Sequence, residues 1–277
     1  DYGAESLVAE YNCGLKTTAQ IISVEIEGDG SEETPFLIST PTQLRVVAYL
    51  TVGNYHFRQI NDIDLSKSYA ETGTDTDKFI HNNGKKFYAP IGTDTAPFDG
   101  VYDGQGYKIT GVKSNRGNEN DIGVFGVVKQ NGTLVTKIKN LHVELMPTDK
   151  VNVMGVSGGT NVGGIVGRIE NGIVENCSVT VGTVTGKQNV GGIAGNFTSS
   201  RIINCFTQSD VNAFNNEVAK PYAGGIVGYS GAQTLSVIRM RNSSFSGNVK
   251  VNNLTTPYVF SYAGGVIGEL VTYADTK

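Results

Sequence analysis

Polar and apolar residues alternate near the start of the chain, and an apolar, glycine-rich phrase recurs along its second half. Ile22, Val24 and Ile26 alternate with polar neighbours, which predicts a half-buried strand over residues 21–27. The turn signal Gly-Asp-Gly-Ser begins at Gly28 and ends this strand. Residues 1–20 have no such pattern and are interpreted as a leader or linker, which leaves 21–277 as a single domain.

The one helix that the sequence predicts covers residues 41–52. Thr40 is a suitable N-cap, Pro41 fills the first helical position, and Gln43 completes a capping box. The apolar residues of this segment share one face, and Gly53 ends it. A single amphipathic helix ahead of a repeat array is expected to act as a lid that covers the apolar end of the first repeat.

The recurring phrase has two glycines, two apolar residues and a closing glycine, in the form GGIVG. Its copies lie at 162–167, 190–195, 223–228 and 263–268, and a diverged copy precedes them at 122–126. The closing glycines are 41, 28, 33 and 40 residues apart. Repeats of uneven length are typical of a solenoid, in which each coil keeps its core while its loops vary. The repeat coils are therefore placed at 121–277.

An asparagine follows each of the first four copies at a similar distance, between two strand-like segments. The four are Asn140, Asn176, Asn204 and Asn242, which lie 14, 9, 9 and 14 residues after the closing glycines. Stacked side-chain amides can bond to the copies above and below, and asparagine tolerates the left-handed backbone of a sharp corner. We predict a buried asparagine ladder along one corner of the solenoid.

The shortest repeat of 28 residues has room for three strands of about five residues and three corners. The glycines allow tight turns where a side chain would meet the next coil. The predicted fold is therefore all-β: a right-handed parallel β-helix, or solenoid, with one N-terminal capping α-helix. We expect the array to continue in a longer native chain.

Composition narrows the function classes. The net charge of -4 argues against nucleic acid and anionic lipid as partners. No stretch of 18 apolar residues is present, so no transmembrane segment is predicted. Cys177 and Cys205 occupy equivalent repeat positions and are expected to be stacked, buried side chains; whether they are bonded is left open.

The motif order resembles a known family. The GG-Ile-Val-Gly phrases followed by Ile-x-Asn-Cys are similar to the GLUG motif of bacterial surface proteins. The segments QINDIDL, FDGVYDGQGYKITGV and IGVFG resemble the region that often precedes it. Such regions occur in surface proteins of Bacteroidetes and ahead of the protease domain of immunoglobulin A1-specific metalloproteases. The resemblance implies a right-handed β-helix, export to the cell surface, outer membrane or extracellular space, and a role in adhesion.

Catalytic motifs are missing from the sequence. None of the three histidines begins a His-Glu-x-x-His zinc motif, and no Gly-x-Ser-x-Gly elbow or Cys-His pair is evident. Asp62 with Asp64, and Asp99 with Asp103, are the carboxylate pairs that a polysaccharide-degrading lyase or hydrolase would need, although turn capping explains them better. No cofactor is expected, with calcium at Asp99 and Asp103 as a weak candidate.

Aromatic residues are the stronger binding candidates. Tyr222 and Tyr262 take the place that asparagine holds before the earlier GG phrases, and Tyr258 and Phe260 lie near them. Stacked rings on a rod could bind a sugar or a partner protein, or could equally pack beneath loops. The sequence therefore predicts a non-enzymatic surface module that binds a glycan or a host or bacterial surface protein, within a polypeptide that has further domains. The alternatives are a polysaccharide-degrading enzyme and a passive stalk ahead of a protease domain.

Overall fold

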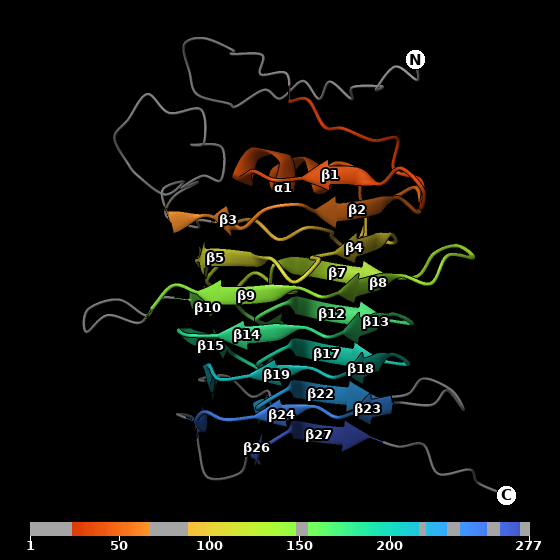
Figure 1. Cartoon of the computed structure of the whole chain (residues 1–277). Coiled ribbons are helices and arrows are strands. Elements are labelled where there is room, and N and C mark those ends of the chain that lie inside the picture. The colour runs from red at the N-terminus through yellow and green to blue at the C-terminus, as the bar shows by residue number, and fades with distance from the viewer. Residues whose placement is uncertain are drawn as a thin grey trace, which may run out of the picture.

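The computed structural model describes residues 24–66, 88–147, 155–215, 220–231, 239–253 and 261–271. Short strands are stacked from β1 at one end to β27 at the other, and the only helix of the described residues, α1, lies beside β1 (Figure 1). Every pairing between strands is parallel, so neighbouring strands of a sheet belong to successive coils of the chain. The predicted all-β parallel β-helix is confirmed.

Two sheets contain the strands on either side of the asparagine corner. Sheet A consists of β1 (Phe36–Ile38), β2 (His56–Gln59), β4 (Val101–Asp103), β8 (Lys137–Lys139), β13 (Ile173–Glu175), β18 (Arg201–Ile203) and β23 (Arg239–Arg241). Sheet B consists of β3 (Ile63–Asp64), β5 (Lys108–Val112), β9 (His142–Leu145), β14 (Ser178–Thr180), β19 (Phe206–Thr207) and β24 (Ser244–Phe245).

Three further sheets complete the coils. Sheet C consists of β6 (Ser114–Asn115), β10 (Gly155–Ser157), β15 (Thr183–Gly186), β20 (Asp210–Asn215) and β25 (Val249–Asn253). Sheet D consists of β7 (Phe125–Lys129), β12 (Val166–Glu170), β17 (Ala194–Thr198), β22 (Val227–Gly231) and β27 (Ile267–Val271). Sheet E consists of β11 (Val162–Gly163), β16 (Asn189–Gly191), β21 (Tyr222–Gly224) and β26 (Tyr262–Gly264).

A full coil passes through five strand segments, not the three that were expected. Residues with left-handed backbone mark three of its corners: Asn171 between sheets D and A, Asn176 between A and B, and Val181 with Gly182 between B and C. Their φ angles lie between +53° and +61°. Because these turns occur every few residues, the coil of 28 residues is divided into shorter strands than a three-sided coil would have.

Helix α1 (Pro41–Val47) is shorter than the predicted 41–52. The Thr40 hydroxyl accepts from the Gln43 N–H, as predicted, but the Gln43 side chain accepts from Ser39 instead of Thr40. After Val47 the chain leaves the helix through two shorter-range hydrogen bonds, from the Tyr49 N–H to the Val46 carbonyl and from the Leu50 N–H to the Val47 carbonyl. The Thr51 carbonyl then accepts from the Asp99 N–H of the neighbouring coil, and the Asp99 carboxylate accepts from two backbone N–H groups. Leu44 and Val47 are nonetheless fully buried, which agrees with a capping role.

The interior is filled by columns of like side chains, one from each coil. Near α1 the column is aromatic: Phe36, Phe57, Phe98 and Phe125 have successive ring centroids 5.7, 5.9 and 5.0 Å apart. Toward the other end, small aliphatic side chains replace the rings, as the column of Ile138, Val174 and Ile202 illustrates. Each contact is local to neighbouring coils, so burial accumulates coil by coil.

Each glycine of the GGIVG phrase has its own steric reason. A Cβ on the first glycine, Gly191, would lie 2.1 Å from the Ala194 carbonyl oxygen of the same coil. On the second, Gly192, it would lie 2.2 Å from the Gly225 oxygen of the next coil, and on the closing Gly195, 2.4 Å from the Val162 nitrogen of the preceding coil. These distances exclude any side chain. The two apolar residues between them, Ile193 and Ala194, are both fully buried.

The predicted asparagine ladder is present at the corner between sheets A and B. Asn176 donates to Asn140 (3.1 Å), Asn204 to Asn176 (3.0 Å) and Asn242 to Asn204 (3.1 Å), all from Nδ2 to Oδ1. All four have φ near +50°. The expectation that the ladder is buried is wrong: Asn176, Asn204 and Asn242 are exposed, because the left-handed turn places the amides on the outside of the corner.

A second ladder, which the sequence reading missed, begins each GG phrase. Asn161 donates to Asp121 (2.7 Å), and Asn189 donates to Asn161 (2.6 Å). In the next two coils Tyr222 and Tyr262 hold this position, so the amide column continues as two stacked rings. Here the amides are buried, and the Asn189 Oδ1 has no hydrogen-bond partner among the described residues.

Cys177 and Cys205 lie one above the other behind the first ladder, each only 1% exposed. Both are free thiols, and each lies near backbone carbonyl oxygens of its own and the preceding coil. Burial raises the pKa of Cys177 well above its usual value. The prediction of two stacked, buried side chains is confirmed, and the pair is not disulfide-bonded.

We expect Gly192→Ala to destabilise the protein strongly, because its Cβ would meet the Gly225 oxygen of the next coil. The loss should lower the melting temperature by roughly 5 °C or more. The matched control is Gly265→Ala, at the same place in the last copy, where an added Cβ meets no atom of the described residues within 4 Å. Circular dichroism melting curves of both variants provide the measurement, and equal melting temperatures would contradict the coil-contact explanation.

Asn204→Ala should lower the melting temperature by several degrees, since it removes two ladder hydrogen bonds and places alanine in a left-handed conformation. Asn204→Gly should cost less, because it removes only the hydrogen bonds. Asn171→Gly is the control, since Asn171 is left-handed but lies at a different corner. If Asn204→Gly melts no lower than Asn171→Gly, the ladder amides contribute nothing to stability.

Candidate functional site

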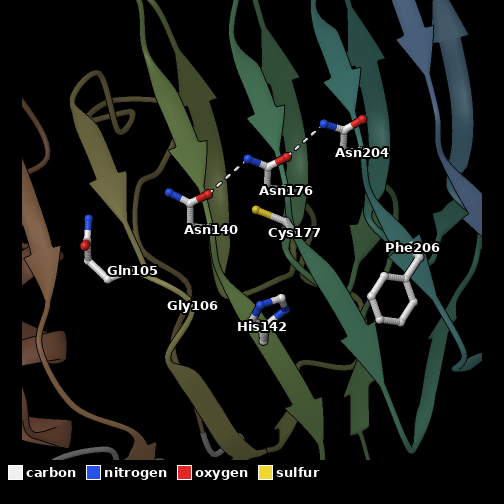
Figure 2. A pocket seen from close by; sticks show the side chains of 8 residues that line it. All are labelled: Gln105, Gly106, Asn140, His142, Asn176, Cys177, Asn204 and Phe206. Carbon is white, nitrogen blue, oxygen red and sulfur yellow. Dashed lines mark hydrogen bonds between the residues drawn. The ribbon is translucent and has the colours of Figure 1, made fainter.

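A surface hollow of about 430 Å³ lies along the first ladder, at the corner between sheets A and B. Figure 2 shows the ladder amides along one side of it, His142 and Phe206 on the other side, and Gln105 beside the first amide. Its lining residues are Gln105, Gly106, Asn140, His142, Asn176, Cys177, Asn204 and Phe206. They come from the β4–β5 turn and from three successive A–B corners, so coil stacking alone assembles the hollow.

The hollow exists because a small side chain lies between two large ones. His142, Ser178 and Phe206 occupy the same position of sheet B in three successive coils. The serine is buried, and its hydroxyl lies 2.7 Å from the His142 Nδ1, which fixes the orientation of the ring. The short serine leaves a gap between the imidazole and the Phe206 ring, and buried Cys177 lies beside it.

The ladder gives the hollow a row of fixed polar groups. Each ladder bond uses one N–H of an amide nitrogen and one lone pair of an amide oxygen. An asparagine amide has two N–H groups and two lone pairs, so a second donor and a second acceptor remain on each rung. Phe206, with 39% of its surface exposed, adds an apolar ring at the edge. Ordered amides beside an exposed ring suit a ligand with both hydroxyl groups and an apolar face.

The sequence reading found the asparagines of this site but missed Gln105, His142 and Phe206. A signal was available. His142 and Phe206 each lie two residues after a ladder asparagine, where strand alternation directs the side chain outward again. Gln105 lies in the turn after Asp103 and donates from its side chain to that carboxylate (2.7 Å).

The predicted tyrosine site lies elsewhere, on sheet E. The rings of Tyr222 and Tyr262 stack with centroids 5.4 Å apart and an interplanar angle of 24°. Tyr262 is 38% exposed, but Tyr222 is only 8% exposed and also contacts Tyr229, so one ring of the pair faces outward. Burial, together with a hydrogen bond to Glu269, raises the pKa of Tyr222. Tyr258 and Phe260 lie outside the described residues.

The carboxylates considered for calcium or catalysis are engaged in capping the backbone and the ladder. Asp99 accepts from the N–H groups of Gly53 and Asn54, and Asp62 and Asp64 each accept from a backbone N–H. Asp103 accepts from the Asn140 amide at 2.9 Å and so forms the first rung of the ladder. Among the described residues, no group of three or more His, Cys, Asp or Glu side chains is placed to hold a metal ion.

Asp103 is suited to this position because a carboxylate only accepts hydrogen bonds. Burial alone would raise its pKa, but hydrogen bonds from Asn140 and Lys139, with that of the Gln105 N–H, hold the pKa below its usual value of 3.8. The Lys139 ammonium lies 2.9 Å from the second carboxylate oxygen. The ionised form of Asp103 is therefore preferred in the folded state.

A depressed pKa makes the contribution of Asp103 to stability depend on pH. This contribution is complete above about pH 4 and is lost as the pH falls through the lower pKa of the folded state. We expect Asp103→Asn to lower the melting temperature at pH 7, and the difference from the unmodified protein to shrink as the pH approaches 2. Melting curves across this range test it, and a difference that does not depend on pH would contradict the electrostatic role.

Comparisons with known proteins identify the repeat. Residues 158–185 match the family model described as the GLUG motif. A proposed Gly-rich membrane protein of Evansella cellulosilytica is 34% identical over 160 residues, which cover 58% of this chain and 16% of that protein. Halomucin of Haloquadratum walsbyi is 28% identical over 225 residues, which cover 80% of this chain and 2% of halomucin. The chain thus matches only a small part of the length of either relative.

The comparison of structures found a crystal structure of a proposed immunoglobulin A1 protease from Bacteroides ovatus. It has a TM-score of 0.44 and 16% identity, with 90% of this chain and 82% of that chain covered.

Within the described residues, no helix has the length and apolar character needed to cross a membrane. The residues of the family match span 28 positions, which is also the offset between the paired strands β13 and β18. The chain therefore carries the GLUG motif, and this motif forms one coil of its parallel β-helix.

Proposed function

We propose that this chain is a non-enzymatic binding module of an exported surface protein and that it holds a glycan in the hollow beside the asparagine ladder. The observation that carries the proposal is the hollow itself, in which three bonded amides face an imidazole and a phenyl ring. The names of the two relatives, a membrane protein and halomucin, support a place at the cell surface or outside the cell. Both relatives are much longer than this chain, which supports further domains in the same polypeptide.

The arrangement is suited to recognition more than to chemistry. The amides of the ladder neither gain nor lose protons, and the carboxylates near the hollow are engaged in hydrogen bonds that stabilise turns and the ladder. A sugar ring has an apolar face and equatorial hydroxyl groups. Phe206 offers a ring for that face, and Asn140, Asn176 and Asn204 offer donors and acceptors one coil apart. Successive coils are separated by about 4.8 Å, so a row of hydroxyl groups can be read by successive rungs.

The test is retention on an immobilised panel of plant, mucin and bacterial glycans, together with host matrix proteins. We expect Phe206→Ala to weaken retention about tenfold, or ~1.4 kcal/mol, because the apolar wall is lost. Phe214→Ala is the control, since Phe214 is equally exposed at 39% but lies on sheet C.

Three outcomes separate the alternatives. Retention that depends on Phe206 but not on Phe214, without release of sugar into the soluble phase, supports the proposal. Sugar release would overturn it in favour of a polysaccharide-degrading enzyme. No retention on any glycan or protein would leave a passive stalk.

A further inference from the structure

The outer face of sheet A carries a row of cationic side chains, although the whole chain has a net charge of -4. Strand alternation places the basic residues outward and residues such as Phe57, Ile138 and Ile202 inward. Six cations and two carboxylates, Asp103 and Glu175, give this face a charge of 6 − 2 = +4. We call the six the basic stripe: Arg58, Lys137, Lys139, Arg201, Arg239 and Arg241.

The two halves of the basic stripe differ in how their charges are balanced. Toward the N-terminal end, Lys139 pairs with Asp103 at 2.9 Å and Lys137 pairs with Glu175 at 3.8 Å. Glu32 also lines a shallow hollow there beside Arg58. Toward the other end, the three arginines at 201, 239 and 241 are exposed and make no ion pair within the part of the chain that the structure describes.

Those three arginines are close to one another. Arg201 and Arg239 are direct partners in the register of β18 and β23, so their backbones are separated by about 4.8 Å. Arg239 and Arg241 are two residues apart on one strand and face the same side. Like charges directly opposite one another repel. A ligand with repeated negative charges would relieve this repulsion and gain a bidentate contact from each guanidinium.

We propose that the basic stripe binds an acidic polysaccharide through its sulfate or carboxylate groups. From β2 to β23 the stripe crosses five steps between strands, or about 24 Å, so an extended chain lying across the strands would meet a cation at most coils. This surface is separate from the hollow, which lies around the asparagine corner. The proposal therefore does not depend on glycan binding there.

A nucleic acid fits this face less well. Single-stranded nucleic acids are bound by aromatic platforms in addition to positive charge. The outward positions of sheet A hold aliphatic and charged side chains with His56, and no Phe, Tyr or Trp, among the described residues. An acidic glycan needs no aromatic platform, so the row of cations is sufficient to bind it.

The experiment measures binding of the intact chain to dextran sulfate, polygalacturonate, neutral dextran and a single-stranded oligonucleotide. We expect dextran sulfate or polygalacturonate to bind, with an affinity that falls as salt is raised, and neutral dextran not to bind. The first two probes distinguish sulfate from carboxylate as the preferred group. The triple variant Arg201→Gln, Arg239→Gln, Arg241→Gln should weaken binding about tenfold or more.

The control removes the same total charge from other faces, with Lys187→Gln, Lys220→Gln and Lys250→Gln, and should leave binding within about twofold. Phe206→Ala should also leave it unchanged, so failure at the stripe and failure at the hollow are distinguishable. Equal losses in the two triple variants, tighter binding of the oligonucleotide, or no binding of either acidic polymer would each overturn the proposal. The exposed positions of the arginines make misfolding a minor concern, and a melting curve of each variant verifies it.

Discussion

Close contact of backbone with backbone between successive coils is the constraint on which the rest of the structure depends. In a GGIVG phrase that has a coil on either side, such as residues 190–195, the chain is so near to its own coil, the coil before and the coil after that no Cβ fits at any of the three glycine positions. This contact fixes the register, and the register aligns the columns of the core, both ladders and the basic stripe. The sites on the surface are therefore consequences of one repeated steric requirement in the interior.

Much of the fold was predictable because the repeated residues keep their places in each coil although the loops between them differ in length. The glycines and the ladder asparagines recur at matched positions, and the structure places them as stacking predicts. The division of each coil into five strands was not predictable, since it depends on left-handed turns at residues such as Val181, which are not typical turn formers. The early end of α1 was also hidden, because the tight turn after Val47 leads into hydrogen bonds with Asp99, which lies about fifty residues away in sequence.

The candidate sites were less accessible to sequence reading for a physical reason. A hollow depends on differences between coils, such as a serine between a histidine and a phenylalanine, whereas repeat analysis detects what coils share. The tyrosine pair shows the opposite case: its substitution for asparagine was visible in the sequence, but burial of Tyr222 beside Tyr229 was not. We therefore expect ligands to bind this rod at positions where successive coils carry different side chains.

The hydrogen bonds of both ladders run in one direction. Each asparagine side chain donates to the equivalent residue of the preceding coil, and each ladder begins on an aspartate, whose side chain has no N–H to donate. Asn242 donates to Asn204, and its own carbonyl oxygen is the acceptor that a further rung would use. A duplicated coil with asparagine at this corner could therefore be inserted between existing rungs or added after the last one without leaving a mismatched amide. If the same coil were placed ahead of Asp103, its asparagine oxygen would receive no hydrogen bond from the aspartate side chain. Tandem duplication can therefore lengthen such a rod at any point after its first ladder aspartate, but not before it.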